Sequence, residues 1–256
     1  MRRALYSLAL LLLTACGGSA PSEPQTESQA TSGGERAAAP QGDPNELVRT
    51  GTELIREGRC VAAIHEGFAP AVRAFEAQAE PGVRVLASRA GGAGALMALL
   101  MAAAEQQNAV VVGPEWPDAI YMHAFCLVEL QRFDEAAQLL ERALAMMPND
   151  VVYSCELGHI MQQRQDWRRS MQLYQGALEN VGLLEQSGAF TAEDTIFGQT
   201  LSDWRRRALR GIGFTQIELG ELDAATETYR QVLAIDPSDE RALHELRVID
   251  ERRRGL

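Results

Sequence analysis

Two pairs of histidine and cysteine are the residues whose types and spacing best suit a metal ion. His123 precedes Cys126 by three positions, and Cys155 precedes His159 by four. Residues three or four apart share a helix face, and two cysteines with two histidines suit zinc. Four ligands must converge on one point, but the first pair falls towards the core of the helical pattern and the second away from it. We therefore expect no metal and no other cofactor.

Catalytic chemistry has few candidates in this sequence. All 24 basic residues are arginine, which excludes enzymes that need a lysine amine for a Schiff base or a phosphate loop. No common nucleophile or metalloprotease motif is present. We expect no enzyme. The alternative is a cell-wall-related hydrolase or enzyme accessory with its site in residues 44–114, where His65 and Glu66 form the one adjacent acid–base pair.

Two features could bind anions, and each has a simpler interpretation. Gly91-Gly92-Ala93-Gly94 opens a predicted helix whose N-terminus could receive an anion, but a tight turn is the better interpretation because no strand is expected before it. Arginines gather at residues 205–210 and 252–254. They are typical of a solvated helix face, and the alternative is a docking patch for an acidic partner. The net charge of −11 argues against nucleic acid as a partner.

The first residues predict export and a lipid anchor. Two arginines precede an apolar run that is too short to span a bilayer, as in a signal peptide. Leu13-Thr14-Ala15-Cys16 resembles the cleavage box of bacterial lipoproteins. The resemblance implies removal of residues 1–15, acylation of Cys16 with chains such as palmitate, and an outer-membrane location facing the periplasm. The alternative is an ordinary secretory signal followed by an incidental cysteine.

The segment after the anchor differs in composition from the rest of the chain. Residues 16–43 contain no large apolar side chain, which predicts a disordered tether. The predicted compartment is oxidising, so the remaining cysteines could pair. A Cys126–Cys155 disulfide is one interpretation, and buried free thiols are the favoured one. With Cys16 acylated, at least one of the other three cysteines stays unpaired within a monomer.

Small and bulky residues recur at matching positions along residues 117–239. The first two sets are 34 residues apart, and a third follows after 21 extra residues. The sets are Ala124, Phe133 and Ala136; Gly158, Trp167 and Ser170; and Gly213, Leu222 and Ala225. Small side chains would let two helices cross closely, and the bulky ones would fill the bend between them. Pro148 and Pro237 would end the second helix of a pair.

This pattern resembles the tetratricopeptide repeat, a helical hairpin with a 34-residue period. The resemblance implies an all-α solenoid in which stacked hairpins bury a continuous core. It places units 1 and 2 in residues 115–184, an insertion in 185–205, unit 3 in 206–239 and a capping helix in 240–256.

Residues 44–114 follow the pattern weakly and are expected to form an irregular helical region. Residues 44–77 would be a degenerate unit whose second helix is interrupted by Pro70. Residues 86–105 predict one buried core helix. Residues 109–114 predict a buried extended connector, because no partner strand is evident.

In tetratricopeptide proteins the first helix of each unit lines a concave groove, and the resemblance implies which residues would contact a partner there. They are Tyr121, Phe125, Glu129, His159, Gln162, Arg207, Arg210 and Phe214. Aromatic rings without a place in the core favour capture of a protein or peptide. The alternative is that the N-terminal helices or the insertion cover the rings. We therefore expect a membrane-anchored, periplasm-facing scaffold or adaptor, with envelope assembly as its process.

Overall fold

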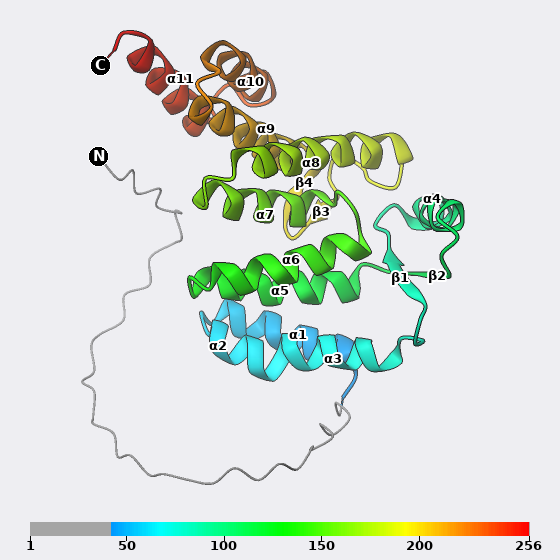
Figure 1. Ribbon diagram of the computed structural model, residues 1–256. Coiled ribbons are helices and arrows are strands. Elements are labelled where there is room, and N and C mark those ends of the chain that lie inside the picture. The colour runs from blue at the N-terminus through cyan, green and yellow to red at the C-terminus, as the bar shows by residue number, and fades with distance from the viewer. Residues whose placement is uncertain (1–41, 256) are drawn as a thin grey trace, which may run out of the picture. The chain divides into compact units, whose positions relative to one another are not determined.

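Pairs of helices joined by short turns make up most of the structure, a computed structural model in which residues 42–255 are described (Figure 1). The predicted signal peptide, Cys16 and most of the tether lie outside the described residues. The helices are α1 (Pro44–Arg56), α2 (Cys60–Ala62), the π-helix η1 (Ala63–Phe68), α3 (Ala69–Gln78), α4 (Gly91–Ala104), α5 (Glu115–Glu129), α6 (Phe133–Met146), α7 (Val151–Gln163), α8 (Trp167–Ser187), α9 (Leu201–Glu218), α10 (Leu222–Ile235) and α11 (Glu240–Arg253). This arrangement confirms the predicted helical-hairpin solenoid. Within residues 42–255 no helix is long and apolar enough to cross a membrane.

The hairpins stack in the order of the sequence (Figure 1). Helix α5 packs on α6, α7 on α8 and α9 on α10, while the contacts of α6 with α7 and of α8 with α9 join neighbouring pairs. Helix α11 packs on α10. One core cluster runs from α1 to α9, and a second, smaller one lies between α9, α10 and α11. A single hairpin could not bury its apolar face, so stacking supplies the core.

The N-terminal hairpin pairs α1 with η1 and α3. Its second helix changes from α to π geometry at Ala63 and returns to α geometry at Ala69, just before Pro70. The N–H of Ala69 donates to the carbonyl of Ile64, five residues back. Proline has no N–H and clashes with the carbonyl four residues earlier, so it disturbs the regular helical ladder. A π-helical turn therefore precedes Pro70, and the helix continues through the proline to Gln78, so the structure shows a local change of geometry and not a break at Pro70.

Residues 84–112 form a βαβ unit, which corrects two predictions. Strand β1 (Arg84–Ala87) pairs in parallel with β2 (Ala109–Val112), with Arg84 opposite Ala109, so the segment predicted as a connector is a strand with a partner. The helix predicted over residues 86–105 overlaps the last two residues of this partner strand, Leu86 and Ala87. That helix, α4, begins only at Gly91.

Helix α4 is also not buried, contrary to the prediction of a core helix. Five of its large side chains are 40–60% exposed: Leu96, Met97, Leu99, Leu100 and Met101. Ala102 is the one buried residue of this helix. Its inner side rests on the two short strands, which are too small to cover it (Figure 1).

The insertion after the second repeat unit carries a β-hairpin. Helix α8 ends at Gly188, whose φ of 66° is left-handed as in many helix C-caps. Strands β3 (Thr195–Ile196) and β4 (Gln199–Thr200) pair in antiparallel fashion across a turn at Phe197-Gly198. The indole N–H of Trp204 donates to the carbonyl of Ile196 at 3.1 Å, which fixes the hairpin to the start of α9.

Candidate functional site

The β3–β4 hairpin covers part of the predicted groove. The ring of Phe197 at its tip lies 4.8 Å from the ring of Tyr121, and the ring of Tyr153 lies 5.6 Å from that of Tyr121. Tyr121 is only 6% exposed, and this burial raises the pKa of its hydroxyl above the ordinary range. The expectation of an exposed Tyr121 is therefore wrong, and the alternative that the insertion covers this ring is correct.

The two arginines expected to hold an acidic ligand already have carboxylate partners. Arg207 forms an ion pair with the buried Glu156 at 2.6 Å and lies over the ring of Trp204 at 5.2 Å. Burial alone would lower the pKa of Arg207, but Glu156 raises it above its usual value. Arg210 pairs with Asp239 at 2.5 Å. An acidic ligand would have to displace these partners.

The other predicted groove residues lie on the face formed by α5, α7 and α9. Gln162 donates to the carbonyl of Gly211 at 3.0 Å and to the hydroxyl of Thr215, so it joins α7 to α9. Phe214 packs edge-on against Trp167. The remaining predicted residues are the half-buried Phe125 and His159 and the exposed Glu129. Burial lowers the pKa of His159, so its ring is held neutral more readily than in water.

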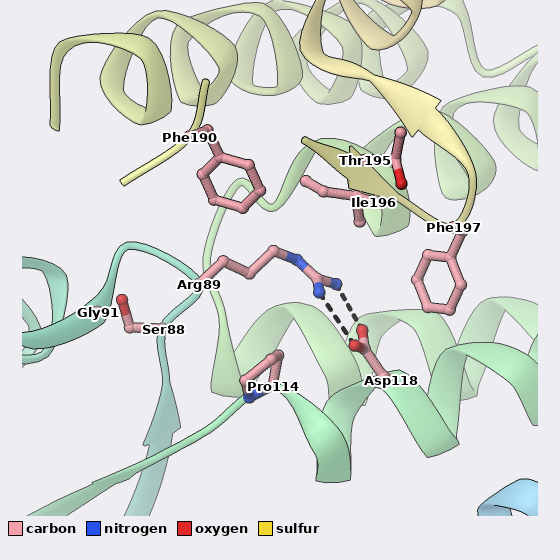
Figure 2. A pocket seen from close by; sticks show the side chains of 9 residues that line it. All are labelled: Ser88, Arg89, Gly91, Pro114, Asp118, Phe190, Thr195, Ile196 and Phe197. Atoms are coloured by element: carbon pink, nitrogen blue, oxygen red, sulfur yellow. Dashed lines mark hydrogen bonds and ion pairs between the residues drawn. The ribbon is translucent and has the colours of Figure 1, made fainter. Parts of the chain in front are cut away.

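Arg89 is the centre of a buried ion cluster that sequence reasoning missed. It leaves the turn after β1 and reaches the N-terminal ends of α5 and α7 (Figure 2). Its guanidinium donates to Asp118 at 2.5 and 3.0 Å, to Asp150 at 2.7 Å and to the hydroxyl of Tyr153 at 3.0 Å. The Arg89 side chain is 7% exposed and that of Asp150 is 1% exposed. Phe197 lies over the guanidinium at 5.8 Å.

The electrostatics of this cluster are those of a structural clamp. Burial alone would lower the pKa of Arg89, but Asp150, Tyr153 and Asp118 together raise it well above its usual value. Burial raises the pKa of Asp150 while Arg89 opposes that change. The guanidinium gives four of its five N–H donors to these groups, and the two carboxylates beside it would repel an anion. The cluster therefore joins the βαβ unit to units 1 and 2 and is poorly suited to acid–base chemistry.

A surface depression of about 440 Å³ lies beside this cluster (Figure 2). It is lined by Ser88, Arg89, Gly91, Pro114, Asp118, Phe190, Thr195, Ile196 and Phe197. Strand β1 leads directly into this region, so the expectation that no strand precedes the glycine-rich segment is wrong. The turn itself is closed by the N–H of Ala90, which donates to the hydroxyl of Ser88 at 3.1 Å.

The other chemical candidates are dispersed in the structure. Among residues 42–255 no three histidine, cysteine or acidic side chains gather as they would around a metal ion. Cys126 and Cys155 are buried free thiols. His65 and Glu66 are exposed on η1 and line a second depression, in which Glu66 is the one carboxylate among the described lining residues. The second carboxylate that the hydrolase alternative requires is therefore not among them.

Helix α4 carries the largest group of exposed large apolar side chains among the described residues. Leu96, Met97, Leu100 and Met101 follow one another around one side of this helix, and residues 91–104 contain no charged side chain. We call these four residues the α4 face. The sequence marks this helix by the absence of a polar side. The same pattern is typical of helices that are buried on all sides, so it does not distinguish the two cases.

Comparisons with known proteins agree with this architecture. The tetratricopeptide repeat family matches residues 118–149 and, separately, residues 208–239. No curated protein matches the chain in sequence.

Solved structures extend the similarity to most of the chain. MamA from Desulfovibrio magneticus RS-1 is 14% identical with a TM-score of 0.53, covering 83% of this chain and 86% of that one. A tetratricopeptide repeat protein from Parabacteroides merdae is 13% identical with a TM-score of 0.54, covering 83% and 60%. PilF of Pseudomonas aeruginosa is 13% identical with a TM-score of 0.51, covering 83% and 69%. At these identities the likeness concerns the fold.

Proposed function

We propose that this tetratricopeptide repeat protein is a non-catalytic scaffold that holds a protein partner against the α4 face. The repeat fold supports a role in protein interaction. The observation that carries the choice of surface is the exposure of four large apolar side chains on one helix: Leu96, Met97, Leu100 and Met101. Apolar area of this kind is stabilised when another surface removes it from water.

The partner is expected to offer an apolar surface of its own, such as one side of an amphipathic helix. Methionine adapts its shape to a partner better than branched side chains do, and two of the four residues are methionines. Arg89 lies two positions before α4 and is fixed by Asp118 and Asp150. The helix is therefore held at a defined place on the repeat stack, which reduces the entropic cost of binding.

The α4 face is proposed in addition to the predicted groove, whose remaining accessible residues are Phe125, Glu129 and His159. Because Tyr121 is covered and Arg207 and Arg210 are paired, the groove offers less free binding surface than its residue types suggest. A long partner could contact both surfaces, with the α4 face contributing the apolar part.

The proposed location is the outer membrane facing the periplasm, with the chain anchored by acylated Cys16. The support is the signal-like start and the cleavage box in the sequence. Fractionation tests this point, because a Cys16→Ala form that stays membrane-bound would contradict the anchor.

Site-specific photo-crosslinking in cells tests the docking surface. A photoreactive residue at Leu96 is expected to give discrete adducts with a partner, and the same residue at Leu183 is the matched control. Leu183 is 64% exposed, comparable to Leu96 at 59%, but lies on another helix, α8. Adducts from Glu129 without adducts from Leu96 would move the site to the groove. Equal adducts from Leu96 and Leu183 would contradict a specific surface.

A further inference from the structure

Cys60 and Cys126 come from two helices, α2 and α5, that pack on each other although 66 positions separate the two residues in the sequence. Cys60 begins α2 and packs against the core cluster that contains Cys126. Cys126 lies on α5, and α2 packs directly on α5. The Cys60 thiol is near enough to Cys126 to contribute to the pKa of that buried thiol. Cys155, the third cysteine of the described residues, is buried elsewhere, on α7.

We propose that Cys60 and Cys126 are a disulfide-forming pair that links the N-terminal hairpin covalently to the first repeat unit. The pairing differs from the Cys126–Cys155 bond considered from the sequence, and it leaves Cys155 as the unpaired thiol. It does not depend on the proposed scaffold function, because it rests on the contact between α2 and α5.

Access favours Cys60 as the first thiol to react. Cys60 is half-buried and lines a surface depression of about 490 Å³ with Arg59, His65 and Glu66, whereas Cys126 is fully buried. A small disulfide such as oxidised glutathione can reach Cys60 from solvent. Burial raises the pKa of the Cys126 thiol above the ordinary range, and the neighbouring Cys60 raises it further. Cys126 is therefore a poor first nucleophile.

The reaction is a two-step thiol–disulfide exchange. The Cys60 thiolate attacks one sulfur of oxidised glutathione, forming a mixed disulfide and releasing one glutathione thiolate, which takes up a proton. Cys126 then loses its proton, and its sulfur attacks the Cys60 sulfur, which releases the second glutathione. The two protein thiols are oxidised to one disulfide, and one glutathione disulfide is reduced to two thiols.

The experiment counts and maps thiols in the full chain carrying Cys16→Ser, which leaves three cysteines. The protein is equilibrated with oxidised and reduced glutathione, quenched in acid and alkylated with N-ethylmaleimide in denaturant. We expect one alkylated thiol per chain, at Cys155. Because trypsin cleaves after arginine, the three cysteines fall in separate peptides, 60–73, 90–132 and 143–164. A linked pair of the first two peptides identifies the bond.

Two variants separate the bond from general folding effects. Cys155→Ser is expected to retain the linked peptides, and Cys60→Ser is expected to show two alkylated thiols while keeping native helicity. Dithiothreitol should lower the Tm of the Cys16→Ser protein by about 5–10 °C, since the bond closes a long loop, and should leave the Tm of the form that also carries Cys60→Ser unchanged. Three alkylated thiols, an unresolved glutathione adduct on Cys60, or a linked pair of peptides 90–132 and 143–164 would each overturn the proposal.

Discussion

The ring of Tyr229 covers Gly213 so closely that a β-carbon on that glycine would lie 2.7 Å from it. The same relationship joins Gly158 to Tyr174, at 2.9 Å, and Gly51 to Phe68, at 2.7 Å. In the two repeat units the ring follows its glycine by sixteen residues, and in the N-terminal hairpin by seventeen. The extra residue belongs to η1, whose π-helical turn brings Phe68 to the position that tyrosine takes elsewhere.

Replacing Gly213 with alanine is expected to destabilise the protein by about 1–3 kcal/mol, because the new methyl group forces the ring or the helix crossing to move. Urea unfolding followed by circular dichroism measures the change. Gly182→Ala is the matched control, since Gly182 also lies in a helix and has open space at its β-carbon position. There alanine should be neutral or stabilise by up to ~1 kcal/mol. An equal loss of stability from Gly213→Ala and Gly182→Ala would contradict the close helix crossing at Gly213.

The repeat units were predictable because their pattern is local. The bulky residues assigned to the bends, Phe133, Trp167 and Leu222, each begin the second helix of a unit in the structure. The small residues Gly158 and Gly213 lie at helix crossings beneath a ring, as their spacing indicates. Contacts within a hairpin join residues only 16 positions apart, so one window of sequence contains both partners.

The βαβ unit and the ion cluster were not predictable because their partners are distant or ambiguous. Strand β1 has only four residues, and its partner follows an entire helix. Arg89 donates to Asp150, which follows it by 61 positions. No local pattern in the sequence indicates that these two residues are partners. Helix α4 has no polar side, and such a pattern does not distinguish a buried helix from one that a partner covers.

Removing the buried guanidinium should be costly. Arg89→Met keeps much of the side-chain volume but leaves Asp118 and Asp150 without their cation, and we expect a loss of about 3–5 kcal/mol in the free energy of unfolding. Chemical denaturation at neutral pH measures it. Arg132→Met is the control, because Arg132 pairs with Glu135 on the exposed surface, where ion pairs contribute little to stability. A loss from Arg89→Met no larger than the control's would mean that the cluster is not structural.

Truncating α4 should change solubility more than stability. Leu100→Ala removes a side chain that is 56% exposed, so we expect a change in unfolding free energy within about 0.5 kcal/mol. Leu140→Ala, at a fully buried site on α6, should cost about 2–5 kcal/mol. Binding of a dye that reports exposed apolar surface should fall in the Leu100 variant of the folded protein. Matching stability losses at the two leucines would place α4 in a core and contradict the proposed docking surface.

Mild acid should destabilise the protein through His123. Burial lowers the pKa of this ring to about 4, and Arg132 adds to the effect while Glu135 opposes it. In the unfolded chain the pKa is near 6.5, so as pH falls from about 6.5 to 4 the unfolded state binds a proton that the folded state does not. Stability is thus full above pH ~6.5 and falls through that interval. The difference corresponds to ~3 kcal/mol at most, and partial exposure of the ring reduces our expectation to about 1–2 kcal/mol.

His123→Gln removes this titration, because glutamine has no proton to gain in that interval. Unfolding curves recorded between pH 7 and 4 should therefore show that the free energy of unfolding falls less for the variant than for the unchanged protein. Some loss of stability in acid should remain in the variant, since burial also lowers the pKa of His159. His244→Gln is the matched control, because it replaces an exposed histidine on α11 by the same residue. Parallel curves for the unchanged protein and His123→Gln would mean that His123 is solvated in the folded state.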